Sequence, residues 1–312
     1  MSLYLGIDTS NYTTSVALYD SNSGQAVNSK KLLPVSQGAV GLRQGDAVFH
    51  HVQQLAQVFE DAVKQADGQI CAVGVSTTPR PVEGSYMPCF SVGKMAAQIV
   101  ASSLRIPLYE LSHQCGHILA ALYDTDNMDY LNRPFIAFHF SGGTSECLYA
   151  VPNEEKLVDI ELEAGSLDLK AGQVIDRVGR MLDIPFPAGM KLDELSHKSK
   201  KKWKVRPTFK GADCCLSGIE NQCKNLLDKG EKPEDIALFA VESIKVVCDK
   251  MAADACRRHP NTPIIFAGGV MSNSIISASL KNKYDCSFAA PALSSDNAVG
   301  AALFAYLKDS KK

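Results

Sequence analysis

The sequence of 312 residues lacks several features, and each absence excludes a class of protein. Its formal net charge is only −2, so it has no overall basic field of the kind that drives non-specific nucleic-acid binding, and we expect no DNA partner. No apolar run approaches the roughly 20 residues that cross a bilayer, so we expect no membrane partner. Disorder is excluded as well, since 46% of the residues are hydrophobic and 21% are charged.

Familiar metal and nucleotide motifs are missing too. No two of the ten cysteines have C-x-x-C spacing, which argues against a zinc ribbon or a thioredoxin-like site. There is neither a Walker loop ending in Gly-Lys-Ser or Gly-Lys-Thr nor a G-x-G-x-x-G dinucleotide loop. The chain starts without a basic segment followed by a long apolar one, so reduced cysteines and a cytoplasmic location are expected.

What is present is an alternation of short strands and amphipathic helices. Residues 3–19 predict a β-hairpin with Asp8, Thr9 and Ser10 at its turn, and 135–151 predict a second one around Ser141-Gly142-Gly143. Further strands are expected at 70–75, 107–111 and 263–267, and helices at 46–66, 92–104, 171–182, 233–258 and 295–307. Strands followed by helices, twice over, indicate two similar α/β domains, in keeping with the length of the chain.

The strongest chemical signal is the pair His113 and His117. On a helix, residues four apart share one face, so the two imidazoles lie close enough to bind one metal ion. Chance pairing of two surface histidines is the competing interpretation. The Glu of a His-Glu-x-x-His motif is absent, so a metallopeptidase would lack its general base.

Two glycine pairs follow predicted strands. Ser141-Gly142-Gly143 offers free backbone N–H groups for an anion, and Gly268-Gly269 precedes a predicted helix start at 270–273, where a nucleotide can approach the backbone. Each signal is weak alone. For Asp176, an ordinary surface position on its helix is the competing interpretation, and for Asp296 it is a helix cap.

Taken in order, these pieces resemble the catalytic subunit of tRNA threonylcarbamoyladenosine synthase (TsaD-like), a family of the actin, sugar kinase and heat-shock ATPase (ASKHA) superfamily. The resemblance covers almost the whole chain. It rests on these segments: Gly6-Ile7-Asp8-Thr9-Ser10, His113 to His117, Ser141-Gly142-Gly143, Asp176 with Gly189 and Asp193, Leu216-Ser217-Gly218, Gly268-Gly269-Val270 with Asn273, and Ser295-Asp296-Asn297-Ala298.

The resemblance implies an α/β fold of two ribonuclease-H-like domains around a nucleotide cleft. The first would comprise residues 1–111 and 296–312, and the second, with the metal and nucleotide site, residues 112–295. The implied cofactors are one divalent ion, iron or zinc, and an adenine nucleotide or carbamoyl-adenylate. The implied site consists of metal ligands His113, His117 and Asp296, nucleotide-binding residues Ser141, Gly142, Gly143, Asp176, Gly189, Asp193, Gly268, Gly269 and Asn273, and catalytic residues Asp8 and Ser10.

This chain also departs from the family pattern. Asp8 stands where a glutamate is usual, and Asn11 where a cysteine is usual. His139 occupies a position where some relatives carry a ligating tyrosine, so a third imidazole on the metal competes with simple packing. Residues 77–88 replace a short Gly-Pro-Gly loop and bring Arg80, Glu83 and Tyr86. The same chemistry on a different acceptor or donor is therefore a serious alternative.

We expect a metal-dependent transfer of a threonylcarbamoyl group to tRNA, or a paralogous carbamoyl transfer. A non-catalytic ATP-binding ASKHA scaffold, a metallopeptidase and a sugar or acetate kinase are the alternatives. The resemblance implies a smaller paralogous subunit and an ATPase, or a homodimer, as partners. The basic run Lys198 to Lys204, with Arg206 and Lys210, is either a solvated loop or the local patch that meets tRNA.

Overall fold

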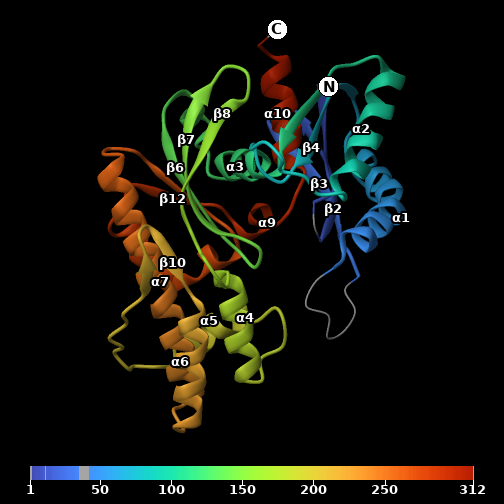
Figure 1. Ribbon diagram of the computed structural model, residues 1–312. Coiled ribbons are helices and arrows are strands. Elements are labelled where there is room, and N and C mark those ends of the chain that lie inside the picture. The colour runs from blue at the N-terminus through green and yellow to red at the C-terminus, as the bar shows by residue number, and fades with distance from the viewer. Residues whose placement is uncertain (1, 11, 35–41, 312) are drawn as a thin grey trace. The chain divides into compact units, whose positions relative to one another are not determined.

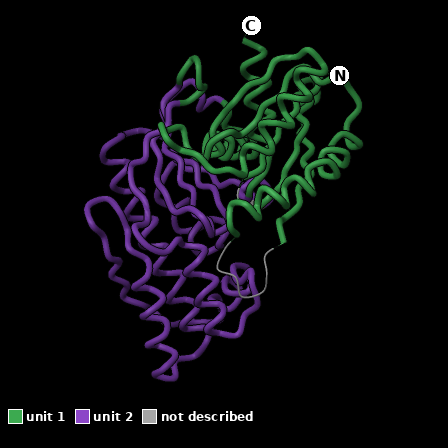
Figure 2. Tube along the Cα trace, turned by 45° about the vertical axis from the view of Figure 1, so that its right-hand side comes forward, with its two compact units in different colours: residues 1–128, 153–158, 296–312 green, residues 129–152, 159–295 purple. Residues whose placement is uncertain are grey.

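The computed structural model describes residues 2–10, 12–34 and 42–311, so Asn11 lies outside the described residues. They form two compact units (Figure 2). Unit 1 comprises residues 1–128, 153–158 and 296–312, and unit 2 comprises residues 129–152 and 159–295. No helix in the described part of the chain is long and apolar enough to cross a membrane.

Unit 1 is a five-stranded mixed sheet with helices on both faces (Figure 1). Its spatial strand order is β3-β2-β1-β4-β5, with β1, β2 and β3 antiparallel and with β4 and β5 parallel to β1. The elements are β1 (Ser2–Asp8), β2 (Thr13–Asp20), β3 (Gln25–Leu32), α1 (Gln44–Val63), β4 (Gln69–Thr78), α2 (Phe90–Leu104), β5 (Leu108–Ser112), α3 (His113–Asp124) and α10 (Val299–Asp309). A 3-10 helix, η1 (Met128–Asn132), lies at the boundary with unit 2.

Side chains alternate along β1, so the two faces of this sheet contact different helices. Leu3, Leu5 and Ile7 are buried with apolar residues of α1 and α2. Gly6 faces the opposite side, where α10 packs, and Asp8 follows it two positions later. The carboxylate of Asp8 therefore points to the face that carries α10 and α3.

Unit 2 repeats the same sheet topology. Its strand order is β12-β11-β6-β7-β8, in which β6 and β7 are antiparallel and β11 and β12 run parallel to β6. Its elements are β6 (Phe135–Phe140), β7 (Ser145–Asn153), β8 (Leu157–Gly165), α4 (Ala171–Met181), α5 (Gly189–Ser196), β9 (Thr208–Lys210), β10 (Asp213–Cys215), α6 (Ser217–Asp228), α7 (Pro233–Arg258), β11 (Ile264–Ala267), η2 (Gly269–Ser272), α8 (Ser274–Lys281), β12 (Cys286–Phe288) and α9 (Pro291–Ser294).

The prediction of two similar α/β domains is confirmed by this repetition. In each unit three consecutive strands form one half of the sheet, and two later strands extend it in parallel beyond the first strand. The predicted hairpins and helices are found as well, with ends shifted by a few residues. The sequence reasoning missed β3, because this edge strand (QAVNSKKL) is largely polar and partly exposed and so lacks an apolar alternation.

The boundary between the units differs from the expected one after residue 111. Helix α3 belongs to unit 1 because its backbone lies directly against α10. A Cβ added at Gly300 would lie only 1.9 Å from the carbonyl oxygen of Gly116, so only glycine permits this approach. The predicted helix at 295–307 begins later, at Val299, and leaves Asp296 in the segment that precedes it.

Candidate metal centre and nucleotide loops

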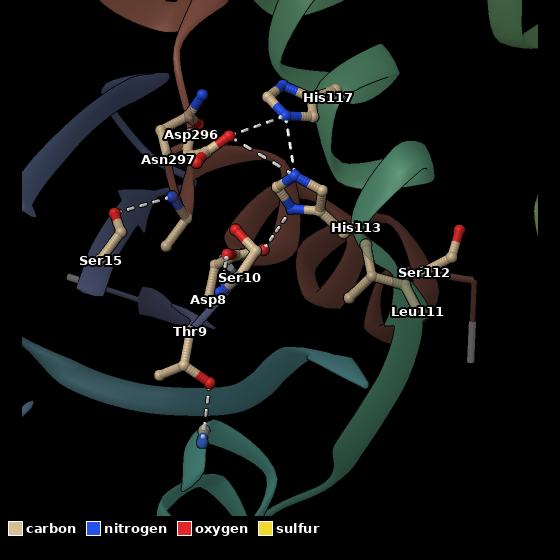
Figure 3. A network of polar contacts seen from close by, with 12 residues as sticks. Asp8, Thr9, Ser10, Ser15, Leu111, Ser112, His113, His117, Asp296 and Asn297 are labelled. Carbon is tan, nitrogen blue, oxygen red and sulfur yellow. Dashed lines mark hydrogen bonds and ion pairs between the residues drawn. The ribbon is translucent and has the colours of Figure 1, made fainter. Parts of the chain in front are cut away.

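Four acidic and imidazole side chains meet within unit 1: Asp8, His113, His117 and Asp296 (Figure 3). Asp8 ends β1, the two histidines lie in the first turns of α3, and Asp296 precedes α10. They come from three segments far apart in the sequence. The sheet and the contact between α3 and α10 bring them together.

The ligand atoms of three of these residues converge on one point. Nε2 of His113 lies 2.9 Å from Nε2 of His117. Oδ1 of Asp296 lies 3.5 Å from the first of these nitrogens and 3.3 Å from the second. All three atoms fall within 4.8 Å of one another.

These separations suit a shared metal ion. Ligand atoms that each lie about 2.0–2.2 Å from one ion, at angles of roughly 90–110°, are about 3 to 3.5 Å apart. Two imidazoles and a carboxylate are also a donor set that iron and zinc accept. The residues present therefore fit the implied metal.

Asp8 contacts the other ring nitrogen of His113, Nδ1, and is not one of the three converging ligands. Its Oδ2 is 2.9 Å from Nδ1 of His113, so the carboxylate accepts the Nδ1 proton and leaves Nε2 directed at His117 and Asp296. The backbone N–H of Ser10 donates to the other carboxylate oxygen over 2.9 Å. A carboxylate that holds the far nitrogen of a histidine is a recurrent feature of metal sites, because it fixes the tautomer and the ring orientation.

Helix caps explain why Asp296 is available to the histidines. The interpretation of Asp296 as a cap of the last helix is not supported, because the Asn297 side chain accepts from the backbone N–H of Val299 over 3.0 Å. The backbone N–H of Ala298 donates to Ser15 over 3.0 Å. Helix α3 has its own cap, Ser112, which accepts from Cys115.

Electrostatics in the metal-free protein follow from this crowding. Burial acts to lower the pKa of His113, but the carboxylates of Asp8 and Asp296 outweigh it and raise that pKa to about 10. Burial and the neighbouring charge of His113 lower the pKa of His117. The histidines hold the pKa values of Asp8 and Asp296 below their usual range despite burial. The cluster therefore favours a charged His113 beside a neutral His117.

Sequence reasoning did not identify His51 and Ser76 as buried polar residues of the same unit. The His51 side chain is fully buried, and its Nδ1 lies 2.8 Å from the hydroxyl of Thr14. Within the described residues, Nε2 of His51, Oγ of Ser76 and Oγ of Ser10 have no hydrogen-bond partner. Burial lowers the pKa of His51 to about 4. The only signal in the sequence was a histidine on the apolar face of a predicted helix.

In unit 2, the two glycine loops lie at neighbouring strand ends. Strands β6 and β11 are parallel and adjacent, so their carboxyl ends meet at one edge of the sheet. Gly268 has a φ of 98°, and a Cβ there would lie 2.2 Å from the carbonyl oxygen of Phe140. Ser141–Gly143 and Gly268–Gly269, predicted separately, are therefore neighbours.

The Ser141 loop is open and contacts the beginning of α4. The Ser141 hydroxyl accepts from the backbone N–H groups of Gly143 and Thr144, and the Ser141 carbonyl oxygen accepts from the N–H of Gly172 over 3.0 Å. Gly142 and Gly143 are exposed. An exposed glycine turn beside a helix N-terminus has the geometry of an anion site.

The remaining predicted nucleotide residues have partners within unit 2. Asp176 accepts from the N–H of Ala188, next to Gly189. Asp193 accepts from the N–H and the hydroxyl of Ser274, over 3.1 Å each. Asn273 caps α8. The structure thus brings Asp193 and the start of α8 together, and the assignment of these residues to ribose and base stays a prediction.

Two features that depart from the family pattern occupy different units. His139 lies on β6 in unit 2, and its role as a further ligand stays a prediction. The segment after β4 contacts the helix that carries the metal ligands, since the Gln114 N–H donates to the carbonyl oxygen of Pro79 over 3.1 Å. Val82 and Tyr86 in this segment are exposed.

Comparison with known proteins identifies the family of this chain. Residues 36–303 match the model of the tRNA N6-adenosine threonylcarbamoyltransferase family. The chain belongs to this family. A member from Staphylococcus haemolyticus is 28% identical, over 98% of this chain and 91% of its own, and one from Clostridium novyi is 30% identical, over 83% and 79%. The family makes the protein a transferase, as predicted.

Solved structures confirm the α/β fold with its two five-stranded sheets. Component A of the (R)-2-hydroxyglutaryl-CoA dehydratase of Acidaminococcus fermentans superimposes over 99% of this chain and 100% of its own, with a TM-score of 0.58 and 17% identity. A putative sugar kinase from Cytophaga hutchinsonii covers 98% of this chain and 99% of its own, with a TM-score of 0.50 and 15% identity. At these identities the likeness concerns the fold alone.

Proposed function

We propose that the protein transfers a threonylcarbamoyl group from a threonylcarbamoyl-adenylate to the N6 nitrogen of a tRNA adenosine, with a bound metal ion. Family membership supports the transfer and the tRNA acceptor. The convergence of His113, His117 and Asp296, with Asp8 behind His113, supports the metal dependence. This convergence is the single observation that carries the proposal.

The three converging residues would hold one iron or zinc ion. When bound, the ion supplies Lewis-acid polarisation and orientation of the carbamoyl group. Asp8 keeps the Nδ1 proton of His113 in place, so that Nε2 presents a lone pair once its proton has left. Ser10, next to this carboxylate, has a buried hydroxyl with no hydrogen-bond partner in the described residues, and we assign it to the catalytic site with Asp8.

The nucleotide half of the donor would bind unit 2. The exposed glycine turn of Gly142 and Gly143, beside the start of α4, would bind the adenylate phosphate, and Gly268–Gly269 lies beside it. We assign Asp176, Gly189, Asp193 and Asn273 to the ribose and base by resemblance to the family. His139, the smaller paralogous subunit, the ATPase and the homodimer are further proposals of the same origin.

A different acceptor is the second candidate. The segment of residues 77–88 contacts α3 directly after His113 and presents Tyr86, whose side chain is 69% exposed. An exposed aromatic residue in a segment that contacts the ligand helix can select another nucleophile. The carbamoyl chemistry would then be kept with a different substrate.

One experiment tests both candidates. Purified protein, loaded with iron or zinc, is given synthetic threonylcarbamoyl-adenylate together with an unmodified tRNA transcript or a panel of small amines, and products are identified by mass spectrometry. We expect AMP release and modified tRNA that both depend on the metal and on His117. Transfer of the carbamoyl group to a small amine but not to tRNA would favour the second candidate. Metal-loaded protein that neither binds nor consumes the adenylate would contradict both and favour the non-catalytic scaffold.

A further inference from the structure

In residues 198–210 of unit 2, which run from the turn after α5 through β9, exposed and partly buried side chains alternate strictly. Every even-numbered side chain from 198 to 210 is exposed, and every odd-numbered one is partly buried. The exposed positions are Lys198, Lys200, Lys202, Lys204, Arg206, Thr208 and Lys210. We call the six cations among them the basic edge. In an extended chain, alternate residues on one face are about 6.6 Å apart, so the basic edge is a regular row of positive charge.

The inward-facing side chains fix this row on α7. Trp203 donates its indole N–H to the carbonyl oxygen of Asp235 over 3.0 Å and meets Phe239 edge-on. The Phe209 ring lies under the ammonium of Lys250, eleven positions after Phe239 in α7. That stretch of helix is about 16 Å long, and six extended residues span about 20 Å. The segment therefore lies stretched along α7, and in Figure 1 it is the chain beside α7 that leads into β10.

The charges of the basic edge are not neutralised by neighbours. Lys201, which faces inward, pairs with Glu231 at 2.5 Å and covers the Trp203 ring. In contrast, no ion pair is found for the six cations of the basic edge among the described residues. Four acidic residues of α7 have other partners: Asp235 with Ser199, Glu242 with Lys245, Asp249 with Lys283 and Asp254 with Arg257. Residues 195–212 contain no Asp or Glu. A row of free cations is thus held at fixed spacing on a protein whose net charge is −2.

We propose that the basic edge binds the phosphate backbone of an RNA. Regularly spaced lysine and arginine side chains are the electrostatic footprint of backbone recognition. An anionic membrane is less suited, because the exposed face of the segment presents no apolar side chain to enter a bilayer. The choice of tRNA as the RNA rests on the proposed function, whereas the edge itself rests on the structure of residues 198–210.

The test measures binding of an unmodified tRNA transcript as a function of salt. The variant combines Lys200→Gln, Lys202→Gln and Lys204→Gln. The matched control combines Lys31→Gln, Lys224→Gln and Lys311→Gln, which removes the same charge from exposed positions elsewhere. Each phosphate contact contributes roughly 0.7 to 0.9 to the slope of log K against log salt, so the variant should reduce the slope by about 2 and weaken binding at least about tenfold at 0.1 M salt. The control should stay close to wild type.

A variant slope equal to that of the control would overturn the inference. So would unchanged tRNA binding together with lost binding to phosphatidylserine vesicles, which would assign the row to a membrane. Unchanged urea unfolding of the variant excludes misfolding, and Arg at the three positions should restore the slope. Failure of the proposed function is distinguishable: wild-type protein would then bind tRNA through the basic edge without transferring the carbamoyl group.

Discussion

The two units share one sheet topology, but their first hairpins carry different chemistry. In unit 1 the turn between β1 and β2 begins with Asp8, which is buried and holds His113. In unit 2 the corresponding turn between β6 and β7 is Ser141 to Thr144, with two exposed glycines. The first hairpin turn thus contributes to a buried charge network in unit 1 and forms an exposed glycine loop in unit 2.

The two sites are stabilised in different ways. In the cluster of unit 1, carboxylates and imidazoles compensate one another within hydrogen-bond distance. The loop in unit 2 leaves glycines exposed and has few side chains around it. Changes in the first turn should therefore alter metal affinity, and changes in the second should alter nucleotide affinity alone.

The largest effect should come from removal of a ligand. His117→Ala or Asp296→Ala should reduce bound metal from one ion per chain to nearly none. Transfer should slow by more than about 100-fold, since changing a residue that only supports a ligand already costs about 10- to 100-fold in metal affinity or activity. His259→Ala is the control, because His259 also pairs with a carboxylate, Glu163, but in unit 2. Elemental analysis measures the ion. Equal metal loss in the control would refute the assignment.

Asp8→Asn removes the buried charge at the end of β1. The amide keeps the shape of the side chain but not the charge that holds the Nδ1 proton of His113, so metal affinity should fall about 10- to 100-fold. Competition with a chromophoric chelator measures this affinity. Ser141→Ala, in the corresponding turn of unit 2, should leave it unchanged. Asp8→Asn protein with wild-type affinity would show that Asp8 does not orient the ligand.

Gly142→Asp adds a negative charge to the turn between β6 and β7. A carboxylate placed in the exposed loop repels a phosphate, so the dissociation constant of AMP or of the adenylate should rise about tenfold. Gly142→Asn, of similar size and without charge, is the matched control. Isothermal titration calorimetry measures both, and metal content should be equal in all three proteins. Unchanged nucleotide binding in Gly142→Asp would place the phosphate elsewhere.

A further effect concerns the pH dependence of the stability of chelator-treated protein. Folding raises the pKa of His113 from about 6.5 to about 10, so the stabilisation by its charge is complete below pH 6.5 and is lost as the pH rises through 10. His51, whose pKa folding lowers to about 4, is neutral in both states above about pH 7.5 and contributes little to the change through pH 10.

The urea midpoint of chelator-treated protein should thus fall between pH 6.5 and 10, and fall less in His113→Gln. Parallel curves for the two proteins would contradict the coupling between His113 and its carboxylates. Metal-loaded protein should lack this dependence, because the ion replaces the proton on Nε2.

Local patterns in the sequence predicted the parts of the site that are local in the chain. The i, i+4 spacing of His113 and His117 and the hairpin turns at Asp8 and Ser141 depend only on neighbouring residues. The basic residues of the segment 198–210 are evident in the sequence, but the alternation of exposed and partly buried side chains was not predicted. The predicted helices and strands followed from apolar periodicity, and polar β3 was missed because it has none.

The long-range parts could not be predicted without the family resemblance. Asp296 reaches the histidines because α10 lies against α3 at Gly300 and Gly116, and no pattern in the sequence encodes this contact. The same contact explains why α3 belongs to unit 1 and not to the expected second domain. Likewise, Gly268 meets the end of β6 only through the parallel pairing of β6 and β11.

The most direct test of the metal centre combines chelation with a transfer assay. Wild-type protein is stripped of metal, assayed with threonylcarbamoyl-adenylate and tRNA, and then titrated with iron or zinc while bound metal is counted. We predict that activity disappears on stripping and returns in proportion to metal, with saturation at one ion per chain in wild type and no recovery in His117→Ala. Full activity of the metal-free protein would contradict the account.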